Sequence, residues 1–125
     1  MRKQYHLRPS PRGLLAWDVD RLIALTSGLP QLSIPLTAIR ELDEPFWFQQ
    51  GDTVPTCRAI AEHAKLMMET DLQYPIILSA DGGVMDGMHR VCRVLLEGRS
   101  HIAAVQFPED PAPDYTGVAA DALPY

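Results

Sequence analysis

Residues 74–90 read YPIILSADGGVMDGMHR, and this segment carries the strongest structural signals in the chain. Pro75 precedes a short apolar run at 76–78, the acidic and glycine-rich run 80–83 is typical of a turn, and a second apolar pair follows at 84–85. This order predicts a β-hairpin. Behind it we expect a helix from about Met88 to Glu97, ended by Gly98, with an apolar side made of Met88, Val91, Val94 and Leu95.

Upstream of this segment, the sequence predicts one short helix and one strand. Asp18 is a suitable N-cap for a helix that runs to about Thr26, with Gly28 at the C′ position. Polar and apolar residues alternate over 32–36, which predicts a strand. Pro35 places that strand at an edge of the sheet or at its end, because proline has no backbone N–H to donate to a neighbouring strand.

Two further periodic stretches complete the expected fold. Residues 56–69 predict an amphipathic helix whose apolar side consists of Ile60, Ala64, Met67 and Met68. The segment from His101 to Phe107 is predicted to form a strand. The resulting order of helices and strands predicts an α+β single domain with a small mixed sheet flanked by helices.

Composition and charge limit the classes of function. The chain has 125 residues, of which 46% are hydrophobic, so one domain with one core is expected. A net charge of −5 disfavours a protein that coats the nucleic-acid backbone. Two cysteines are too few for a disulfide scaffold, and we therefore expect a cytoplasmic protein. Since no apolar run approaches the roughly 18 residues of a membrane span, no membrane partner is expected.

The two ends of the chain carry opposite charges. Residues 1–15 contain only basic charged side chains, whereas residues 109–125 contain only acidic ones, and both segments are rich in proline. We therefore predict a basic arm at 1–15, a folded domain at 16–108 and an acidic tail at 109–125, with both ends extended and without regular elements. The ends could pair with each other or with a neighbouring subunit, so a homo-oligomer is left open.

The run Asp86-Gly87-Met88-His89-Arg90 lies where a strand is expected to end and a helix to begin. Free backbone N–H groups at a helix N-terminus attract anions, and Gly87 lets a ligand approach the backbone closely. Arg93 lies one turn beyond Arg90, close to His89 on the same helical surface. These features predict an anion site that binds phosphate.

A purely structural interpretation of the same residues stays open. Asp86 would then be the N-cap of the helix, and Arg90 and Arg93 would lie on its solvated side, paired with Glu97. Elsewhere, the aromatic run 46–48 is either a core plug or a lid over a substrate. His63 has no partner that the sequence identifies, and the two cysteines, Cys57 and Cys92, are expected to be small buried residues.

The succession of strand, acidic turn, second strand and D-G-x-H-R box resembles the core of the ParB/sulfiredoxin superfamily. The similarity covers residues 31–107, in which residues 34–39, IPLTAI, are similar to the family's opening strand and turn. It implies a ParB/sulfiredoxin-like fold. Sulfiredoxins place a catalytic cysteine before the histidine, where this chain has Met88, so a sulfinic-acid reductase is not expected. A complete chromosome-partitioning ParB is not expected at this length.

Members of this family bind nucleotide phosphates on the box, so the resemblance implies ATP or another nucleotide as cofactor, together with Mg²⁺. The implied phosphate contacts are Gly87, Met88, His89, Arg90, Arg93 and Arg58. Asp86 would hold the metal ion and serve catalysis together with His89. The free-serine kinases of the family carry a proposed base after the opening strand. Here that acid would be one of Glu41, Asp43 and Glu44, with Glu44 taken as the candidate.

Two classes of function therefore remain open. The first is a nucleotide-dependent phosphotransferase or nucleotide hydrolase acting on a phosphate-bearing small molecule. The second is a non-catalytic module that binds a nucleotide or another anion and regulates association. A nucleic-acid-binding domain is disfavoured by the net charge.

Overall fold

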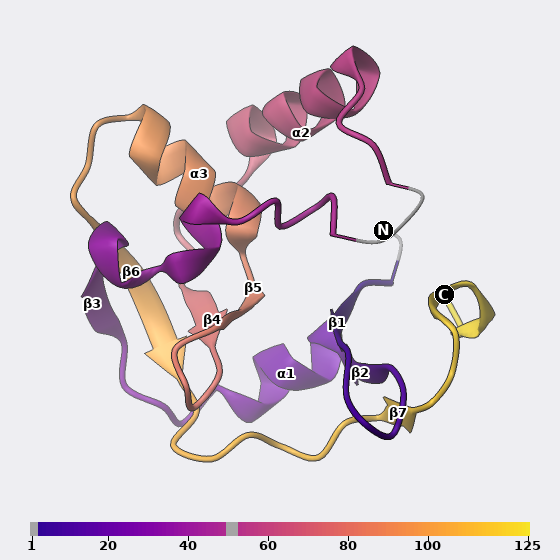
Figure 1. The fold of residues 1–125 in the computed structure, drawn as a ribbon. Helices are drawn as coiled ribbons and strands as arrows, with labels where there is room; N and C mark the ends of the chain where they lie inside the picture. The colour runs from indigo at the N-terminus through magenta and orange to yellow at the C-terminus, as the bar shows by residue number, and fades with distance from the viewer. Residues whose placement is uncertain (1–2, 50–52) are drawn as a thin grey trace.

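A computed structural model describes residues 3–49 and 53–125 as an α+β domain with two sheets (Figure 1). Its helices are α1 (Val19–Leu25), α2 (Cys57–Glu69) and α3 (Met88–Leu96), and short 3₁₀ turns lie at η1 (Leu36–Ala38), η2 (Arg40–Asp43) and η3 (Ala120–Ala122). Its strands are β1 (Tyr5–Arg8), β2 (Leu15–Asp18), β3 (Leu32–Pro35), β4 (Ile76–Leu78), β5 (Val84–Asp86), β6 (His101–Gln106) and β7 (Tyr115–Thr116). The expected α+β class is confirmed.

The larger sheet has four strands in the order β3-β6-β4-β5. Strands β4 and β6 are parallel, whereas β3 pairs with β6 and β5 pairs with β4 in antiparallel fashion, so the sheet is mixed. The predicted hairpin is confirmed as β4 and β5, and the strand that contains Pro35 is the edge strand β3, as expected.

Both faces of the larger sheet are covered, because alternate residues of a strand point to opposite faces. Ile76 and Leu78 of β4 pack in one cluster with Val91 of α3. Ile77, between them, packs on the opposite side in a second cluster with Trp17 of β2 and Leu22 of α1. The molecule therefore has three layers, with α3 on one face of the sheet and α1 with β2 on the other.

The second sheet is formed by the two ends of the chain, in the order β1-β2-β7. The prediction that both ends lack regular elements is wrong, since the arm contributes β1 and the tail contributes β7. The alternative that the ends pair with each other is confirmed: Arg8 Nη1 lies 3.2 Å from Asp110 Oδ2, and the Tyr5 hydroxyl donates to the backbone carbonyl of Pro124 at 2.5 Å. Strands β1 and β7 have only four and two residues, too few for a recognisable alternation of polar and apolar residues, and prolines lie near both.

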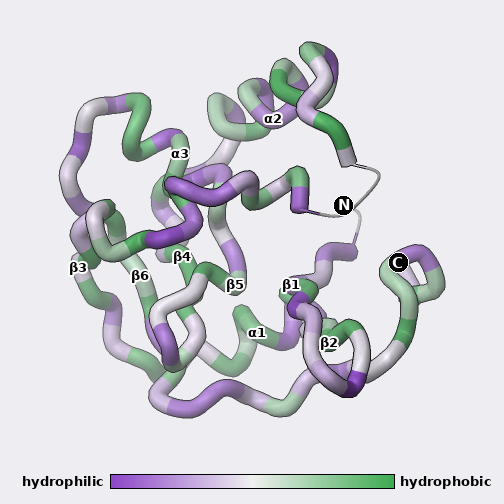
Figure 2. The backbone as a smooth tube through the Cα atoms, viewed as in Figure 1, coloured by the Kyte–Doolittle hydropathy of each residue, from purple (hydrophilic) through white to green (hydrophobic). Residues whose placement is uncertain are grey.

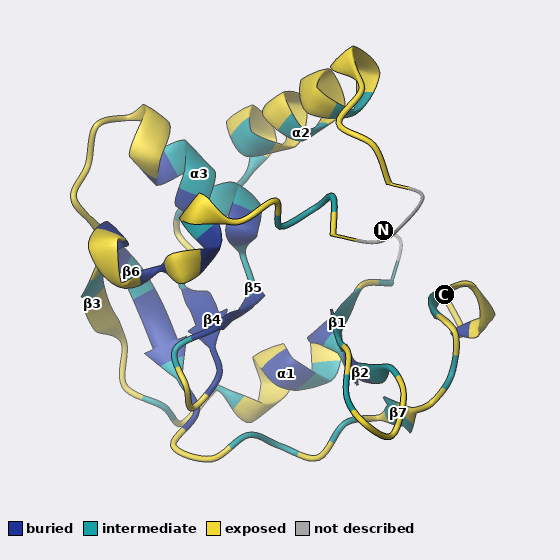
Figure 3. Ribbon diagram, viewed as in Figure 1, coloured by how far each residue is buried: buried dark blue, intermediate teal, exposed yellow. Residues whose placement is uncertain are grey.

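Helix α1 begins as predicted, with the Asp18 carboxylate accepting a hydrogen bond from the backbone N–H of Asp20. It ends at Leu25 with Thr26 as C-cap, so Gly28 is not the C′ residue, and no left-handed φ occurs there. The bounds of α3 are confirmed, with Gly98 in the left-handed region at φ 74°. Leu95 is exposed rather than part of its apolar side: it forms the exposed end of α3 together with Leu96, whereas Val94 beside it is buried (Figure 3).

Helix α2 has the predicted bounds but packs with a different side. Ile60 and Met68 are 54% and 61% exposed, and no residue of α2 is buried. Ala59, His63 and Met67 are the residues of α2 that are half-buried, toward α3. Within the described part of the chain, no helix is long and apolar enough to cross a membrane.

Candidate functional site

The box at the start of α3 is held together by its own residues. Gly87 precedes α3 with φ at 107°, and a Cβ atom at this position would lie 2.6 Å from Cγ2 of Ile76 and 2.7 Å from Nη2 of Arg90. Only glycine fits there, because both the backbone conformation and the close packing exclude a side chain. The guanidinium of Arg90 therefore lies directly over the backbone at the beginning of the helix.

Asp86 and Arg90 form an ion pair across this turn. Arg90 Nη2 lies 2.8 Å from Asp86 Oδ2, and the two side chains are only 13% and 17% exposed, respectively. Gly87 is the N-cap residue of α3 and no side chain caps the helix, so the alternative that Asp86 is the N-cap is wrong. The alternative partner for Arg90, Glu97, is wrong as well, since Glu97 pairs with Arg93 and Arg99. The ion pair leaves the Nε atom of Arg90 buried and without a hydrogen-bond partner.

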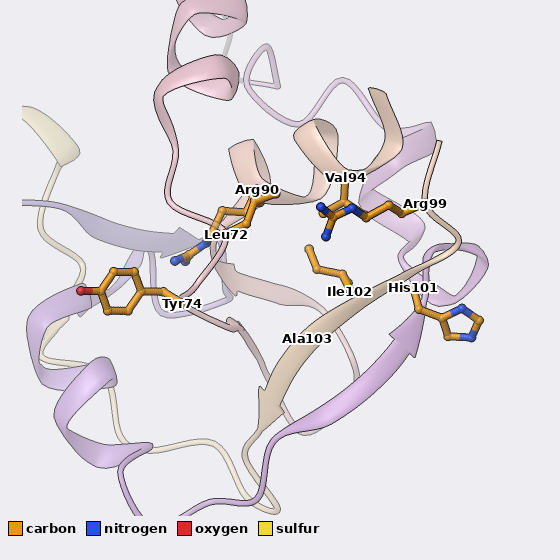
Figure 4. Close-up of a pocket in the computed structure, with 8 residues that line it drawn as sticks. All are labelled: Leu72, Tyr74, Arg90, Val94, Arg99, His101, Ile102 and Ala103. Carbon is orange, nitrogen blue, oxygen red and sulfur yellow. The ribbon is translucent and has the colours of Figure 1, made fainter. Parts of the chain in front are cut away.

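A small cavity of about 80 Å³ opens beside Arg90 (Figure 4). It lies between α3, the start of β6 and the loop before β4. Its lining residues are Leu72, Tyr74, Arg90, Val94, Arg99, His101, Ile102 and Ala103. Figure 4 shows Arg90 and Tyr74 at one end and Arg99 at the other, above Ile102, with the ring of His101 turned outward at the rim.

The polar lining of this cavity is basic. Arg90 and Arg99 both line it, whereas their acidic partners, Asp86 and Glu97, are not among its lining residues. Guanidinium groups bind phosphate and carboxylate oxygens through paired N–H donors. The cavity can therefore accept one anionic group. Sequence analysis missed Arg99 and Tyr74: the pairing of β6 with β4 brings Arg99 to the box, and the β4–β5 hairpin brings Tyr74 to it.

Of the six predicted phosphate contacts, only Arg90 lines this cavity. Arg93 donates from Nη1 to the backbone carbonyl of Met68 at 2.7 Å and from Nε to Glu97 at 2.8 Å, so it joins α3 to the end of α2. Arg58 is exposed on the N-terminal turn of α2, which points away from the body in Figure 1. Met88 is buried in the core, and only its backbone is available to a ligand.

His89 lies on a different side of α3 from Arg90 and does not line this cavity. Its ring stacks on Trp47 with 4.5 Å between centroids, and its Nε2 lies 2.8 Å from Nδ1 of His63, which also stacks on Trp47. Burial lowers the pKa of His89 from 6.5 to about 4, with a further contribution from the neighbouring His63, and burial also lowers the pKa of His63. Both imidazoles are therefore neutral at pH 7. The prediction that His63 lacks a partner is wrong.

Of the two alternatives for the aromatic run 46–48, packing against the core is confirmed for Phe46 and Trp47. Phe46 and Trp47 pack against the core cluster below α3, and Trp47 also covers the two histidines. The expectation that both cysteines are buried is wrong for Cys57, which is exposed, while Cys92 is half-buried.

The candidate base Glu44 is exposed and lines a second cavity, together with Glu41. That cavity lies between β1, η2 and the turn of the β4–β5 hairpin, and Arg90 does not line it. The structure thus brings together Asp86, Gly87 and Arg90, and separates them from Glu44. Among residues 3–49 and 53–125, no group of three or more His, Cys, Asp and Glu side chains is placed to hold a metal ion.

Comparison with known proteins adds no assignment: no family model, no curated protein and no solved structure matches this chain. Function is therefore inferred from the residues of the site.

Proposed function

We propose that this protein binds a phosphate-bearing small molecule, a nucleotide such as ATP, with its phosphate in the cavity beside Arg90. The observation that carries the proposal is the buried Nε of Arg90, which has no hydrogen-bond partner while its Nη2 is paired with Asp86. A buried donor without an acceptor is costly, and an oxygen of a bound phosphate would satisfy it. Arg99 would supply a second guanidinium to the same group.

The size of the cavity supports one phosphate group rather than a whole nucleotide. About 80 Å³ is the share of liquid volume of roughly two or three water molecules. The sugar and base would then lie on the surface, where Tyr74 is 64% exposed and offers an aromatic ring for stacking. Asp86, the predicted metal ligand, is paired with Arg90 and does not line this cavity, so a Mg²⁺ ion that accompanies the nucleotide would be held by phosphate oxygens and water.

We also propose that the domain is ParB/sulfiredoxin-like. The succession of β3, α2, the β4–β5 hairpin, α3 and β6 supports this relationship. Within it, sulfinic-acid reduction is not proposed, because a buried methionine, Met88, occupies the position where sulfiredoxins carry their cysteine.

Phosphoryl transfer or nucleotide hydrolysis is a second candidate function, favoured by the position of Asp86 next to Arg90. Such chemistry depends mainly on positioning the phosphates and a metal ion. Glu44 does not support it, since it lines the other cavity. Phosphate release that depends on Mg²⁺ and is lost in Asp86→Asn would establish turnover. Binding without release would favour the non-catalytic module.

The first experiment is thermal unfolding with ATP, ADP, CTP, GTP and inorganic pyrophosphate, each with and without Mg²⁺. A ligand at about 100 times its Kd stabilises a protein by about 2.7 kcal/mol, which raises Tm by several degrees in a domain of this size. Arg99→Ala should weaken binding about tenfold, because a hydrogen bond to a charged group is worth about 1.5–3 kcal/mol. Arg99 is exposed, so this variant should fold.

Arg58→Ala is the matched control, since it removes an exposed arginine that lies outside the cavity. Equal weakening by both variants would show that general positive charge, and not the cavity, attracts the ligand. Absence of stabilisation by all five compounds would refute the proposed phosphate site.

A further inference from the structure

The second cavity has a volume of about 220 Å³ and lies apart from the box at the start of α3. It is enclosed by strand β1, the 3₁₀ turn η2 and the turn between β4 and β5. The residues that give it its chemistry are Arg8, Arg40, Glu41, Glu44, Phe46 and Asp81. Arg90 and Arg99 do not line it, so its ligand would be independent of the proposed phosphate site.

Glu41 is the buried charged residue of this cavity. Its side chain is held at the sheet edge, where Oε2 accepts a hydrogen bond from the backbone N–H of Val84 in the edge strand β5, at 2.8 Å. The residue is only 7% exposed, and its second oxygen, Oε1, is buried without a hydrogen-bond partner. Buried carboxyl oxygens are normally satisfied, so Oε1 marks a place for a donor that is not part of the chain.

The charges around Glu41 indicate which kind of donor fits. Both arginines of the cavity are already paired: Arg40 Nη2 lies 3.1 Å from Asp81 Oδ2, and Arg8 Nη1 lies 3.2 Å from Asp110 Oδ2. Glu41 and Glu44 have no ion pair within the described part of the chain. Arg40 also interacts with the charges of Glu41 and Glu44, so this single arginine faces three carboxylates, those two and Asp81, and the excess of negative charge favours a positively charged ligand.

Two neighbours strengthen this preference. Phe46 lines the cavity, and an aromatic ring attracts a cation that lies over its face. His6 also lines it, and burial lowers the pKa of His6 to about 4, so this histidine adds no positive charge at pH 7. A metal ion is a poor candidate, because the described residues place no group of three or more metal-binding side chains together.

We propose that this cavity is a binding site for a small organic ammonium ion, whose N–H groups donate to the free oxygen of Glu41 and to Glu44 and whose positive charge lies against Phe46. The site is distinct from the phosphate cavity in residues, in sign of charge and in ligand.

The test uses the purified protein and amines of known structure, without nucleotide. Ethylammonium, ethanolamine and putrescine are titrated by calorimetry and by thermal unfolding, with tetramethylammonium as a cation that lacks N–H donors and 1-propanol as a neutral analogue. We expect stabilisation by at least one primary amine and at least tenfold weaker binding of the two analogues, because they cannot donate a charged hydrogen bond.

Variants then identify the residues. Glu41→Gln and Glu44→Gln should each weaken amine binding about tenfold, whereas Glu69→Gln, the same change on the exposed surface of α2, should not alter it. Glu44 is exposed, so its variant tests the site even if Glu41→Gln impairs folding. The proposal is overturned if no amine binds, in which case water satisfies Glu41, or if tetramethylammonium binds as tightly as the primary amines.

A separate observation concerns the outer side of α2. Figure 2 shows hydrophobic and hydrophilic residues alternating along this helix, and Figure 3 shows it largely exposed. Four small or apolar residues, three or four positions apart, form a strip on that side: Cys57, Ile60, Ala64 and Met68. None of them is buried, so this strip has no partner within the described chain.

Discussion

The histidine pair beneath Trp47 should make the stability of the protein depend on pH. The folded state lowers the pKa of His89 from 6.5 to about 4, chiefly by burial, and also lowers that of His63. Between these pH values the unfolded chain binds more protons than the folded one, so stability is full above pH 6.5 and falls as the pH drops toward 4. Below about pH 4 the loss is complete, because both states are then protonated.

The magnitude follows from the size of the shift. Each pKa unit corresponds to 1.36 kcal/mol, so the full shift of His89 would be worth about 3 kcal/mol. His89 is only partly buried, and solvent screening reduces the expected loss to about 1–2 kcal/mol. His89→Phe keeps a ring against Trp47 but cannot be protonated, so it should remove this part of the pH dependence.

Urea unfolding at pH 7 and at about pH 4.5 measures the effect in the wild type, in His89→Phe and in His101→Phe. His101 is exposed on β6 and serves as the control that should keep the wild-type pH dependence. His6, whose pKa is also lowered, is present in all three proteins and cancels in the comparison. An equal pH dependence in His89→Phe and wild type, or a His89 pKa of 6.5 or more by NMR, would refute the reasoning.

Three further predictions concern single contacts. Gly87→Ala should destabilise the protein by about 2 kcal/mol or more in urea unfolding, since it adds a Cβ at φ 107° and 2.6 Å from Ile76; a loss below about 0.5 kcal/mol would contradict this geometry. Trp47→Ala should raise the pKa of His89 toward 6.5 in an NMR titration, because Trp47 supplies part of its burial; an unchanged pKa would assign that burial to other groups. Arg8→Ala should cost about 0.5–1.5 kcal/mol, because it removes the ion pair to Asp110 and the contact over the ring of Trp17; a neutral result would show that the two ends are held by strand pairing alone.

A few consecutive residues were sufficient to predict three features of the fold. The Asp81 and Gly82 turn predicts the hairpin, Gly98 predicts the end of α3, and Asp18 predicts the start of α1, because each of these effects depends on a few consecutive residues. Periodicity alone could not select the packed side of α2. The helix carries apolar residues on more than one side, and only the position of α3 decides that His63 and Met67 face inward while Ile60 faces outward.

The sequence by itself determined an α+β domain and the position of its hairpin and of α3. It also identified Gly87 together with the charged residues Asp86 and Arg90. Tertiary structure decided which side chains meet. Asp86 and Arg90 could be identified together because they are one helical turn apart, whereas Arg99 joins them only through the pairing of β6 with β4. In the same way, His63 meets His89 through the packing of two helices. Contacts between residues distant in sequence depend on the packing of whole layers, and no short pattern records that packing.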